Sequence, residues 1–138
     1  MKLIPVKEFP WAAQVLYDLL KVRAPEENIS HRVMPSYEEH INFFESNPYD
    51  AWYLIEKEFC TEYFGAIYIN RGEIGIHLFP QHRNKGYEII AIRMLFAKCA
   101  LERYFINVAV DNRALADAAK YLGGKMIQVT YEIKNERA

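Results

Sequence analysis

The sequence predicts one α/β domain of the α+β kind, in which a mixed, mainly antiparallel sheet is flanked by helices. Its 138 residues are close to the commonest size of a single domain, and 51% of them are hydrophobic, including ten Tyr and eight Phe, which favours a compact core. Helical and strand-like hydrophobic patterns follow one another in the order β-α-α-β-β-β-α-β-α-β. No linker or repeat interrupts this order, so we expect residues 1–138 to form one domain.

The first third of the chain predicts a short strand and two helices. Residues 2–7 suit the strand, and Pro10 suits the first turn of a helix that ends before Pro25. Ser36 and Glu39 have the spacing of a capping box, which predicts the start of the second helix. Asn47-Pro48 then ends that helix.

A three-stranded meander is predicted for the middle of the chain. Asn70-Arg71-Gly72 is a tight hairpin signal between its second and third strands. In the third strand, apolar residues alternate with Glu73, Gly75 and His77, so one face is apolar and the other is mixed. The predicted strands are residues 51–56, 62–69 and 73–78.

A polar, basic loop at residues 81–86 follows the meander. Beyond it, the residues of one mainly apolar side recur at helical spacing from Ile89 to Arg103, which predicts a long helix. Residues 105–110 are nearly all apolar, which is typical of a strand buried on both faces.

The end of the chain predicts a helix and a final strand. Asn112 is a good residue to open the helix, and Gly123-Gly124 is a good pair to close it. Residues 125–134 then have strand-like composition. They contain Met126, Ile127, Val129, Tyr131 and Ile133.

Composition and charge exclude several classes of function. The formal net charge is −1, so there is no general attraction to the phosphate backbone of nucleic acids. No run approaches the roughly 18 apolar residues of a membrane span, and the N-terminus lacks the apolar core of a signal peptide. Cys60 and Cys99 are far apart and lack metal-ligand spacing, which favours a reduced compartment. We therefore predict a cytoplasmic protein with no metal, no membrane partner and no nucleic-acid partner.

The passage from the third meander strand into the long helix is the strongest functional signal. A loop that turns directly into a helix presents unpaired backbone N–H groups at the positive end of the helix dipole, which favours phosphate binding. Gly86 permits a close backbone approach, while Arg83 and Lys85 supply positive charge. On the residues alone, a phosphate-bearing ligand and a merely solvated basic loop are about equally good interpretations.

The same passage resembles the acetyl-coenzyme A motif of the GNAT superfamily of N-acetyltransferases. Leu78, Pro80, Arg83 and Gly86 match that motif in register. The order of predicted elements also resembles the family over essentially the whole chain. The resemblance implies an enzyme that transfers an acetyl group from acetyl-coenzyme A (acetyl-CoA) to a primary amine of a small molecule, an amino sugar or a protein.

The resemblance also implies which residues contact acetyl-CoA. Leu78 would supply a backbone N–H to the thioester end, residues 83–88 would wrap the pyrophosphate, and Asn112 would contact the arm between them. The complete set of expected contacts is Leu78, Phe79, Arg83, Asn84, Lys85, Gly86, Tyr87, Glu88 and Asn112.

The sequence departs from the family pattern at three positions. Glu88 stands where the motif normally has Gly or Ala, and its carboxylate would lie near the expected pyrophosphate. Ala119 stands at the register of the tyrosine that often serves as general acid, and Tyr121 lies about 200° further around the helix. Asn107 stands where some protein-directed members have a glutamate.

Three side chains are therefore the candidates for handling the proton: Glu73, His77 and Tyr121. Glu73 and His77 share the mixed face of the strand that leads to the loop, and either could relay a proton through water. The alternatives are an exposed strand carboxylate for Glu73 and a packed or solvent-facing imidazole for His77. For His31, His40 and His82 we expect surface or capping roles.

The sequence leaves three functional hypotheses. The first is an acetyl-CoA-dependent N-acyltransferase. The second is a catalytically inactive GNAT-like module that binds acyl-CoA or serves in an assembly, with a homodimer as one possible form. The third, a nucleotide-binding protein, is disfavoured because the loop lacks the Gly-rich Lys-Ser/Thr ending of a nucleoside-triphosphate site.

Overall fold

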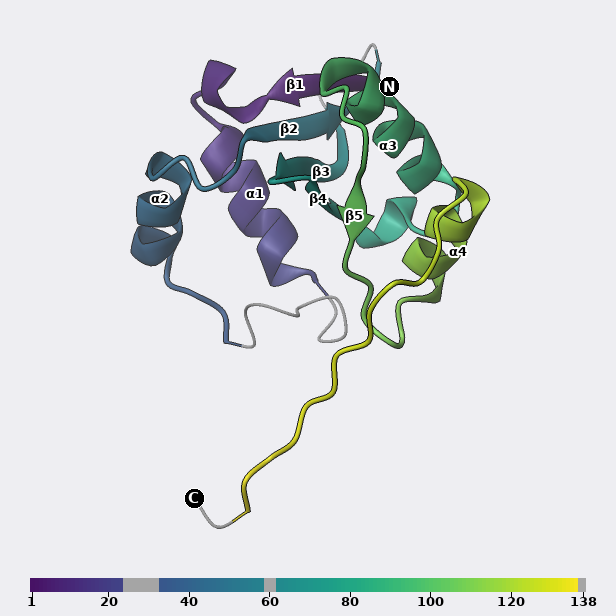
Figure 1. Ribbon diagram of the computed structural model, residues 1–138. Coiled ribbons are helices and arrows are strands. Elements are labelled where there is room, and N and C mark those ends of the chain that lie inside the picture. Colours follow the sequence, from purple (N-terminus) through teal and green to yellow (C-terminus); the bar gives the residue numbers. More distant parts are fainter. Residues whose placement is uncertain (24–32, 59–61, 137–138) are drawn as a thin grey trace.

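The computed structural model describes residues 1–23, 33–58 and 62–136, and these form an α/β fold built on one five-stranded sheet (Figure 1). The strands lie side by side in chain order, β1 to β5. Every neighbouring pair is antiparallel except β4 and β5, which are parallel. The strands are β1 (Lys2–Pro5), β2 (Ala51–Glu56), β3 (Tyr63–Asn70), β4 (Glu73–Leu78) and β5 (Phe105–Ile106).

Helices cover both faces of this sheet (Figure 1). Two short 3-10 turns, η1 (Val6–Glu8) and η3 (Pro80–His82), lead into the first and third helices. Helices α1 and α2 pack on one face, and α3 and α4 pack on the other. The helices are α1 (Ala12–Lys21), α2 (Tyr37–Glu45), α3 (Tyr87–Lys98) and α4 (Arg113–Tyr121). The predicted fold class is confirmed.

Alternation along the strands divides the core into two layers. In β4, Ile74, Ile76 and Leu78 are buried against the α3 side, so the residues between them face α1 and α2. Leu54 of β2 lies in the layer under α1, whereas its neighbour Ile55 lies in the layer under α3. Each face of the sheet therefore has its own apolar cluster.

Local capping signals fix the starts of α2 and α4. The Glu39 backbone N–H donates to Ser36 Oγ at 3.1 Å, and the Ser36 N–H donates to Glu39 Oε1 at 3.1 Å, which is the predicted capping box. At α4, the Leu115 N–H donates to Asn112 Oδ1 at 3.2 Å. Both caps satisfy helix N–H groups that would otherwise lack an intrahelical acceptor.

Helix α3 is shorter than the predicted helix, which was expected to reach Arg103. It ends at Lys98 because the chain turns around the Tyr104 hydroxyl. That hydroxyl accepts from the Leu101 N–H at 2.8 Å and donates to the Cys99 carbonyl at 2.6 Å. These hydrogen bonds between the Tyr104 side chain and the backbone just before it end the helix, although the apolar pattern continues.

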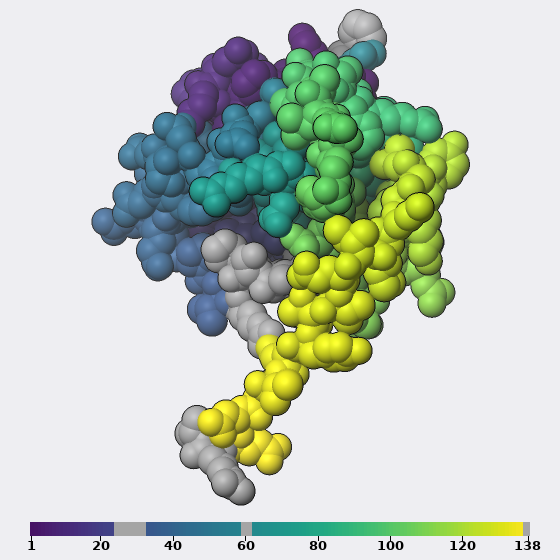
Figure 2. Space-filling model, viewed as in Figure 1, coloured from purple at the N-terminus to yellow at the C-terminus, as the bar shows by residue number. Residues whose placement is uncertain are grey.

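Two predicted strands at the end of the chain are corrected by the structure. Only Phe105 and Ile106 of residues 105–110 pair with a neighbour, and Val110 is 99% exposed rather than buried. Residues 125–134 form no strand. They extend away from the body of the domain with their side chains exposed, as the yellow segment in Figure 2 shows. Both segments have strand-like composition, but a strand forms only where another strand satisfies its backbone groups.

Within the described residues, no helix has both the length and the apolar composition that crossing a membrane requires.

Candidate functional site

The candidate site begins where β5 separates from β4. The parallel pairing involves only the first two residues of β4, Glu73 and Ile74. From Gly75 to Leu78, β4 has no register partner in β5, so this part of its edge faces a gap between the two strands. Backbone N–H and C=O groups on this edge can form hydrogen bonds with a ligand, just as the edge of a sheet can form them with an added strand.

The backbone of Leu78 points toward this open edge. The Phe79 N–H donates to the Phe64 carbonyl in β3 at 2.9 Å, so the backbone groups of the preceding residue, Leu78, point in the opposite direction. The Leu78 carbonyl indeed accepts from Arg83 Nε at 3.0 Å on that side. The N–H of Leu78 therefore faces the gap, where the sequence analysis expected a ligand.

The turn after β4 places a helix N-terminus beside the same edge. Two residues of the turn, Asn84 (φ 61°) and Gly86 (φ 80°), have the left-handed backbone conformation. Gly86 is the N-cap of α3 and makes no side-chain cap, so no side-chain cap covers the first N–H groups of the helix. An added Cβ at Gly86 would meet nothing within 4 Å, so its conformation, and not lack of space, favours glycine.

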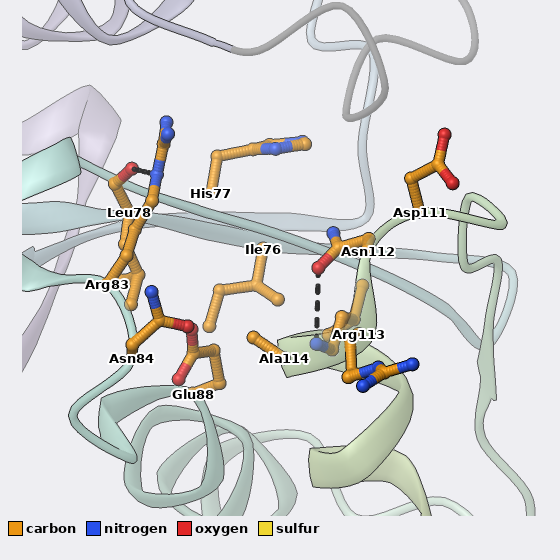
Figure 3. Close-up of a pocket in the computed structure, with 11 residues that line it drawn as sticks. Ile76, His77, Leu78, Arg83, Asn84, Glu88, Asp111, Asn112, Arg113 and Ala114 are labelled. Atoms are coloured by element: carbon orange, nitrogen blue, oxygen red, sulfur yellow. Dashed lines mark hydrogen bonds between the residues drawn. The ribbon is translucent and has the colours of Figure 1, made fainter.

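A cavity of about 270 Å³, here called the edge cavity, occupies the space between β4, the turn and the start of α4 (Figure 3). Its walls come from four elements that are separated in sequence. They are Ile76, His77, Leu78, Arg83, Asn84, Glu88, Asp111, Asn112, Arg113, Ala114 and Leu115.

Five of the nine expected acetyl-CoA contacts line the edge cavity: Leu78, Arg83, Asn84, Glu88 and Asn112. The other four contribute to the surrounding framework. Phe79 and Tyr87 pack against the apolar clusters of the two sheet faces, while Lys85 and Gly86 are exposed on the turn.

The Arg83 side chain links three parts of the site. Its Nε donates to the Leu78 carbonyl at 3.0 Å, and its Nη2 donates to the carbonyl of Val22, just after α1, at 3.2 Å. These bonds hold the guanidinium at the boundary between the edge cavity and the α1 side of the sheet. Arg83 therefore has a structural role in addition to its positive charge.

Glu88 places a carboxylate in the edge cavity. It lies on the first turn of α3, and its side chain points into the same corner of the cavity as Asn84 (Figure 3). A negative group near the helix N-terminus is favourable for the helix dipole. The Glu88 carboxylate therefore lies near the N-terminus of α3, where the turn would otherwise favour the binding of an anionic ligand.

A second cavity, also of about 270 Å³, lies on the opposite face of the sheet, between β2 to β4 and helices α1 and α2. We call it the aromatic cavity, because four aromatic rings line it. Tyr49 and Tyr68 stack with centroids 3.8 Å apart, and Trp52 meets Tyr49 edge-on at 4.9 Å. Its lining residues are Leu16, Leu19, Leu20, Arg23, Pro35, Glu39, His40, Phe43, Tyr49, Trp52, Ala66, Tyr68 and His77.

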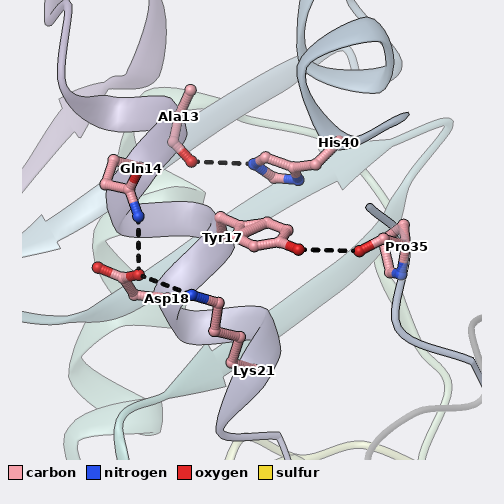
Figure 4. Close-up of polar contacts among 7 residues, drawn as sticks. All are labelled: Ala13, Gln14, Tyr17, Asp18, Lys21, Pro35 and His40. Carbon is pink, nitrogen blue, oxygen red and sulfur yellow. Dashed lines mark hydrogen bonds and ion pairs between the residues drawn. The ribbon is translucent and has the colours of Figure 1, made fainter. Parts of the chain in front are cut away.

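Polar contacts between α1 and the segment around α2 support the aromatic cavity (Figure 4). A ring nitrogen of His40, Nε2, lies 2.9 Å from the Ala13 carbonyl, and the Tyr17 hydroxyl donates to the Pro35 carbonyl at 3.0 Å. His40 is buried, and burial lowers its pKa. Its role is to join the two helices and not the surface role expected from the sequence.

His82 is also buried and structural. Its Nε2 lies 2.8 Å from Glu62 Oε1, and its ring packs against Phe64 with centroids 4.6 Å apart. These contacts attach the turn that follows β4 to the beginning of β3. The third histidine of this group, His31, lies outside the described residues.

His77 lines both cavities and is the residue where they meet. It projects from β4 toward the α1 face, because it alternates with the buried residues Ile76 and Leu78. Burial, reinforced by the positive charges of Arg23 and Arg83, lowers its pKa to about 3. The imidazole is therefore neutral at physiological pH.

The other two proton-handling candidates lie away from this junction. Glu73 is exposed at the start of β4, four residues or about 13 Å along the strand from His77. Tyr121 is 66% exposed at the end of α4, with the Arg93 guanidinium 5.5 Å from its ring centroid. Neither residue lines the edge cavity or the aromatic cavity.

The aromatic cavity is the part of the site that sequence reasoning missed. Its rings come from Phe43, Tyr49, Trp52 and Tyr68, which belong to separate elements. One local signal was available: Trp52, Tyr68 and His77 lie on the same face of three consecutive strands, which alternation and register could have revealed.

Comparisons with known proteins agree with this geometry at the level of the fold. No known family's sequence profile matches the chain, and no curated protein matches it by sequence. Among solved structures, it is similar to a spermidine N-acetyltransferase SpeG chimera from Vibrio cholerae and hSSAT. The TM-score is 0.69 at 16% identity, and the match covers 89% of this chain and 81% of that chain. The resemblance noted around the turn after β4 is thus confirmed for the architecture, and the chain has the fold of a GNAT N-acetyltransferase.

Proposed function

We propose that this protein is an N-acyltransferase that moves an acetyl group from acetyl-CoA to a primary amine. The observation that carries the proposal is the meeting of two cavities at His77. A direct transfer needs two molecules whose reactive ends come together while their bodies occupy separate spaces. The edge cavity suits acetyl-CoA, and the aromatic cavity suits the amine.

Backbone groups are the main contacts for acetyl-CoA in this proposal. The first N–H groups of α3 lie at the positive end of the helix dipole and would bind the pyrophosphate. The Leu78 N–H on the open β4 edge would bind near the thioester. Asn112 already uses its Oδ1 to cap α4, so its side-chain NH2 is the donor that it offers to the ligand.

The reaction requires the amine nitrogen to attack the thioester carbonyl carbon. The C–N bond forms, the C–S bond breaks, coenzyme A leaves as a thiolate that takes up a proton, and the amine gives up a proton. Neutral His77 can accept a hydrogen bond from the attacking amine through a ring nitrogen. Because its pKa is about 3, it would orient the amine and pass the proton to water without becoming a stable imidazolium.

The aromatic cavity favours an amine on an apolar or aromatic body. One similar solved structure is that of a spermidine N-acetyltransferase chimera, whose named substrate carries several amines. In this chain, Glu39 is the only acidic side chain among the described residues that line the aromatic cavity, and Arg23 lines it too. A substrate with several positive charges is therefore disfavoured.

Thermal unfolding with and without acetyl-CoA tests the binding step. A ligand present at 100 times its dissociation constant adds about 2.7 kcal/mol of stability, which gives an increase of several degrees in Tm. Asn112→Ser keeps a capping hydroxyl but removes the side-chain NH2, so it should weaken acetyl-CoA binding at nearly unchanged stability. Absence of any Tm shift at millimolar acetyl-CoA would contradict the proposal.

Release of free thiol from acetyl-CoA in the presence of a panel of amines tests the transfer. We expect turnover with apolar primary amines, and a large loss in His77→Ala. The carboxylate of Glu88 in the edge cavity favours one competing function, an inactive GNAT-like module. That alternative predicts acyl-CoA binding without thiol release from any amine.

A further inference from the structure

A positive charge lies in the wall of the aromatic cavity. Arg23 lines this cavity together with His77 and the aromatic rings, and its Nε is shielded from solvent. Burial and the neighbouring Tyr68 raise the pKa of Tyr49, and the Arg23 charge acts against that rise. Burial lowers the pKa of His77, and the Arg23 charge lowers it further. The guanidinium is therefore close enough to both Tyr49 and His77 to affect their ionisation.

The end of α1 fixes where Arg23 lies. Its backbone N–H donates to the Leu20 carbonyl at 3.4 Å, and the carbonyl of the preceding residue, Val22, accepts from Arg83 Nη2 at 3.2 Å. The C-terminal end of a helix carries a partial negative charge, which favours an arginine at this place. The backbone of Arg23 is thus held in position before a ligand binds, which lowers the entropic cost of binding.

Glu39 is the acidic side chain that lines the aromatic cavity in the part of the chain that the structure describes. Its Oε1 accepts from the Ser36 N–H at 3.1 Å, and hydrogen bonds from Ser36 hold the pKa of the Glu39 carboxyl below its ordinary value. In the proposed transfer, the attacking nitrogen becomes positively charged beside His77, and the Arg23 charge opposes that step. A substrate that brings its own negative group to Arg23 removes this conflict.

The chemistry of the aromatic cavity specifies three parts of a complementary ligand. A planar guanidinium binds a carboxylate through two parallel hydrogen bonds, so Arg23 suits a carboxylate. The stacked rings of Tyr49 and Tyr68 suit an apolar or aromatic group. His77 is the residue at which the amine meets acetyl-CoA. The cavity volume of about 270 Å³ suits a molecule with on the order of ten non-hydrogen atoms, so all three parts belong to one small molecule.

We propose that the acceptor is a free α-amino acid with an apolar or aromatic side chain, and that its carboxylate binds the Arg23 guanidinium. One carbon separates the amine from the carboxylate in such a molecule, so the two groups reach His77 and Arg23 together. The neutral amine attacks the thioester carbonyl carbon, the C–N bond forms and the C–S bond breaks. The amine gives up a proton, the coenzyme A thiolate takes one up, and the product is an N-acetyl amino acid. This inference rests on the proposed acetyl transfer and names its substrate class.

Rates of thiol release with three matched amines are the first test. Phenylalanine carries the carboxylate, phenethylamine lacks it, and phenylalaninamide replaces it with a neutral amide, as in the N-terminus of a peptide. We expect kcat/KM for phenylalanine to exceed the other two values by about 10- to 100-fold, the effect of one charge-assisted pair. The amine of phenylalaninamide is the least basic and has the largest neutral fraction, so reactivity alone predicts the opposite order.

Substitution of Arg23 tests the assigned contact. Arg23→Gln should remove the preference for phenylalanine over phenethylamine, whereas Arg23→Lys keeps the charge and should retain part of it. A purely structural role would instead lower the rates with all three amines by the same factor. Lys21→Gln is the matched control and should keep the full preference. It removes an exposed positive charge from the last turn of α1, where Lys21 pairs with Asp18 (Figure 4) and does not line the cavity. Circular dichroism verifies that each variant is folded.

Calorimetric titration without acetyl-CoA separates a failure of this inference from a failure of the proposed transfer. The unmodified chain should bind phenylalanine more tightly than phenethylamine, and Arg23→Gln should abolish the difference. If that binding is found without turnover of any amine, the transfer is contradicted and the assigned ligand class stands. If phenethylamine or phenylalaninamide is acetylated as well as phenylalanine, or if Arg23→Gln keeps the preference, the amino-acid assignment is overturned and the transfer stands. Absence of both turnover and binding overturns the assignment as well.

Discussion

Glu88 and Asp111 are the two acidic side chains among the described residues that line the edge cavity, and Glu88 is the one on the first turn of α3. It lines the edge cavity beside the start of α3, where a pyrophosphate would bind. Glu88→Gln keeps the shape and removes the charge, and we expect it to tighten acetyl-CoA binding about tenfold, or about 1.4 kcal/mol. Glu88→Gly should also tighten binding, although glycine in a helix costs about 1 kcal/mol of stability.

Calorimetric titration of acetyl-CoA at low ionic strength measures this effect. Glu102→Gln, which removes an exposed carboxylate from the turn after α3, is the control and should leave the affinity unchanged. Unchanged or weaker binding in Glu88→Gln would show that the carboxylate does not repel the ligand.

His77 should also make the stability of the fold depend on pH. Its folded-state pKa of about 3 lies below the ordinary value of 6.5, so the unfolded chain takes up a proton that the folded chain does not. The stability contributed by the neutral ring is fully present above pH 6.5 and is lost as the pH falls toward 3. His40 acts in the same direction, because burial lowers its pKa too.

Melting temperatures measured from pH 7 to pH 4 test this dependence. The fall in Tm with acidification should be smaller in His77→Gln than in the unmodified protein, with the residual slope attributable in part to His40. Equal slopes in the two proteins would mean that His77 is protonated as readily in the folded state as in the unfolded state.

At the scale of elements, two glycines of the sheet allow two tests. A side chain at Gly65 tests the stability of the sheet, and a side chain at Gly75 tests the shape of the aromatic cavity. A Cβ at Gly65 in β3 would overlap the carbonyl oxygen of His77 and lie 2.8 Å from the Leu78 Cα, both in the backbone of β4. A Cβ at Gly75 would overlap the ring of Tyr68, a side chain that can rotate. Because the Cβ at Gly65 would clash with backbone atoms, the clash could be removed only by moving β3 and β4 apart.

We expect Gly65→Ala to destabilise the protein by about 1–3 kcal/mol, the typical cost of overpacking. Gly75→Ala should cost less, but it should displace Tyr68 from its stack on Tyr49 and change the near-ultraviolet circular dichroism of the aromatic residues. Urea unfolding of both variants gives the stabilities. The opposite ranking would indicate that β3 and β4 can move apart more easily than Tyr68 can turn.

The elements that the sequence predicted well are those that local chemistry specifies. The capping box at Ser36 and the hairpin signal at Asn70-Arg71-Gly72 act over a few residues, and both appear in the structure, the second with left-handed Arg71 and Gly72. The end of α3 was misplaced because it depends on the Tyr104 hydroxyl, which no helical periodicity encodes.

At the scale of the whole molecule, the candidate site was only partly predictable. Leu78, Arg83 and Gly86 belong to one continuous segment whose pattern could be read directly. His77 followed from alternation, whereas Tyr121 was placed by helical register alone, and the structure sets it away from the cavities. The aromatic cavity could not be predicted as a unit, because its walls come from five elements and exist only after the sheet and helices have packed.

The final segment shows the limit of composition as a guide to structure. Apolar and polar residues alternate in residues 125–134 as they do in a strand. A strand also needs a neighbouring strand for its backbone hydrogen bonds, and the alternation does not provide one. In this fold, the nearest candidate edge ends after Phe105 and Ile106. The pattern of these residues alone therefore does not decide whether they form a strand.

The two cavities lie on opposite sides of one strand, and this placement affects how substrates would enter the site and products would leave it. Molecules that meet at the His77 imidazole would arrive by different entrances, and the products would separate in different directions. A bulky nucleotide would then never have to pass the aromatic rings, and a newly acylated amine would never have to pass the turn before α3. With separate entrances, a mutation that reshapes the entrance of one cavity would leave the entrance of the other open.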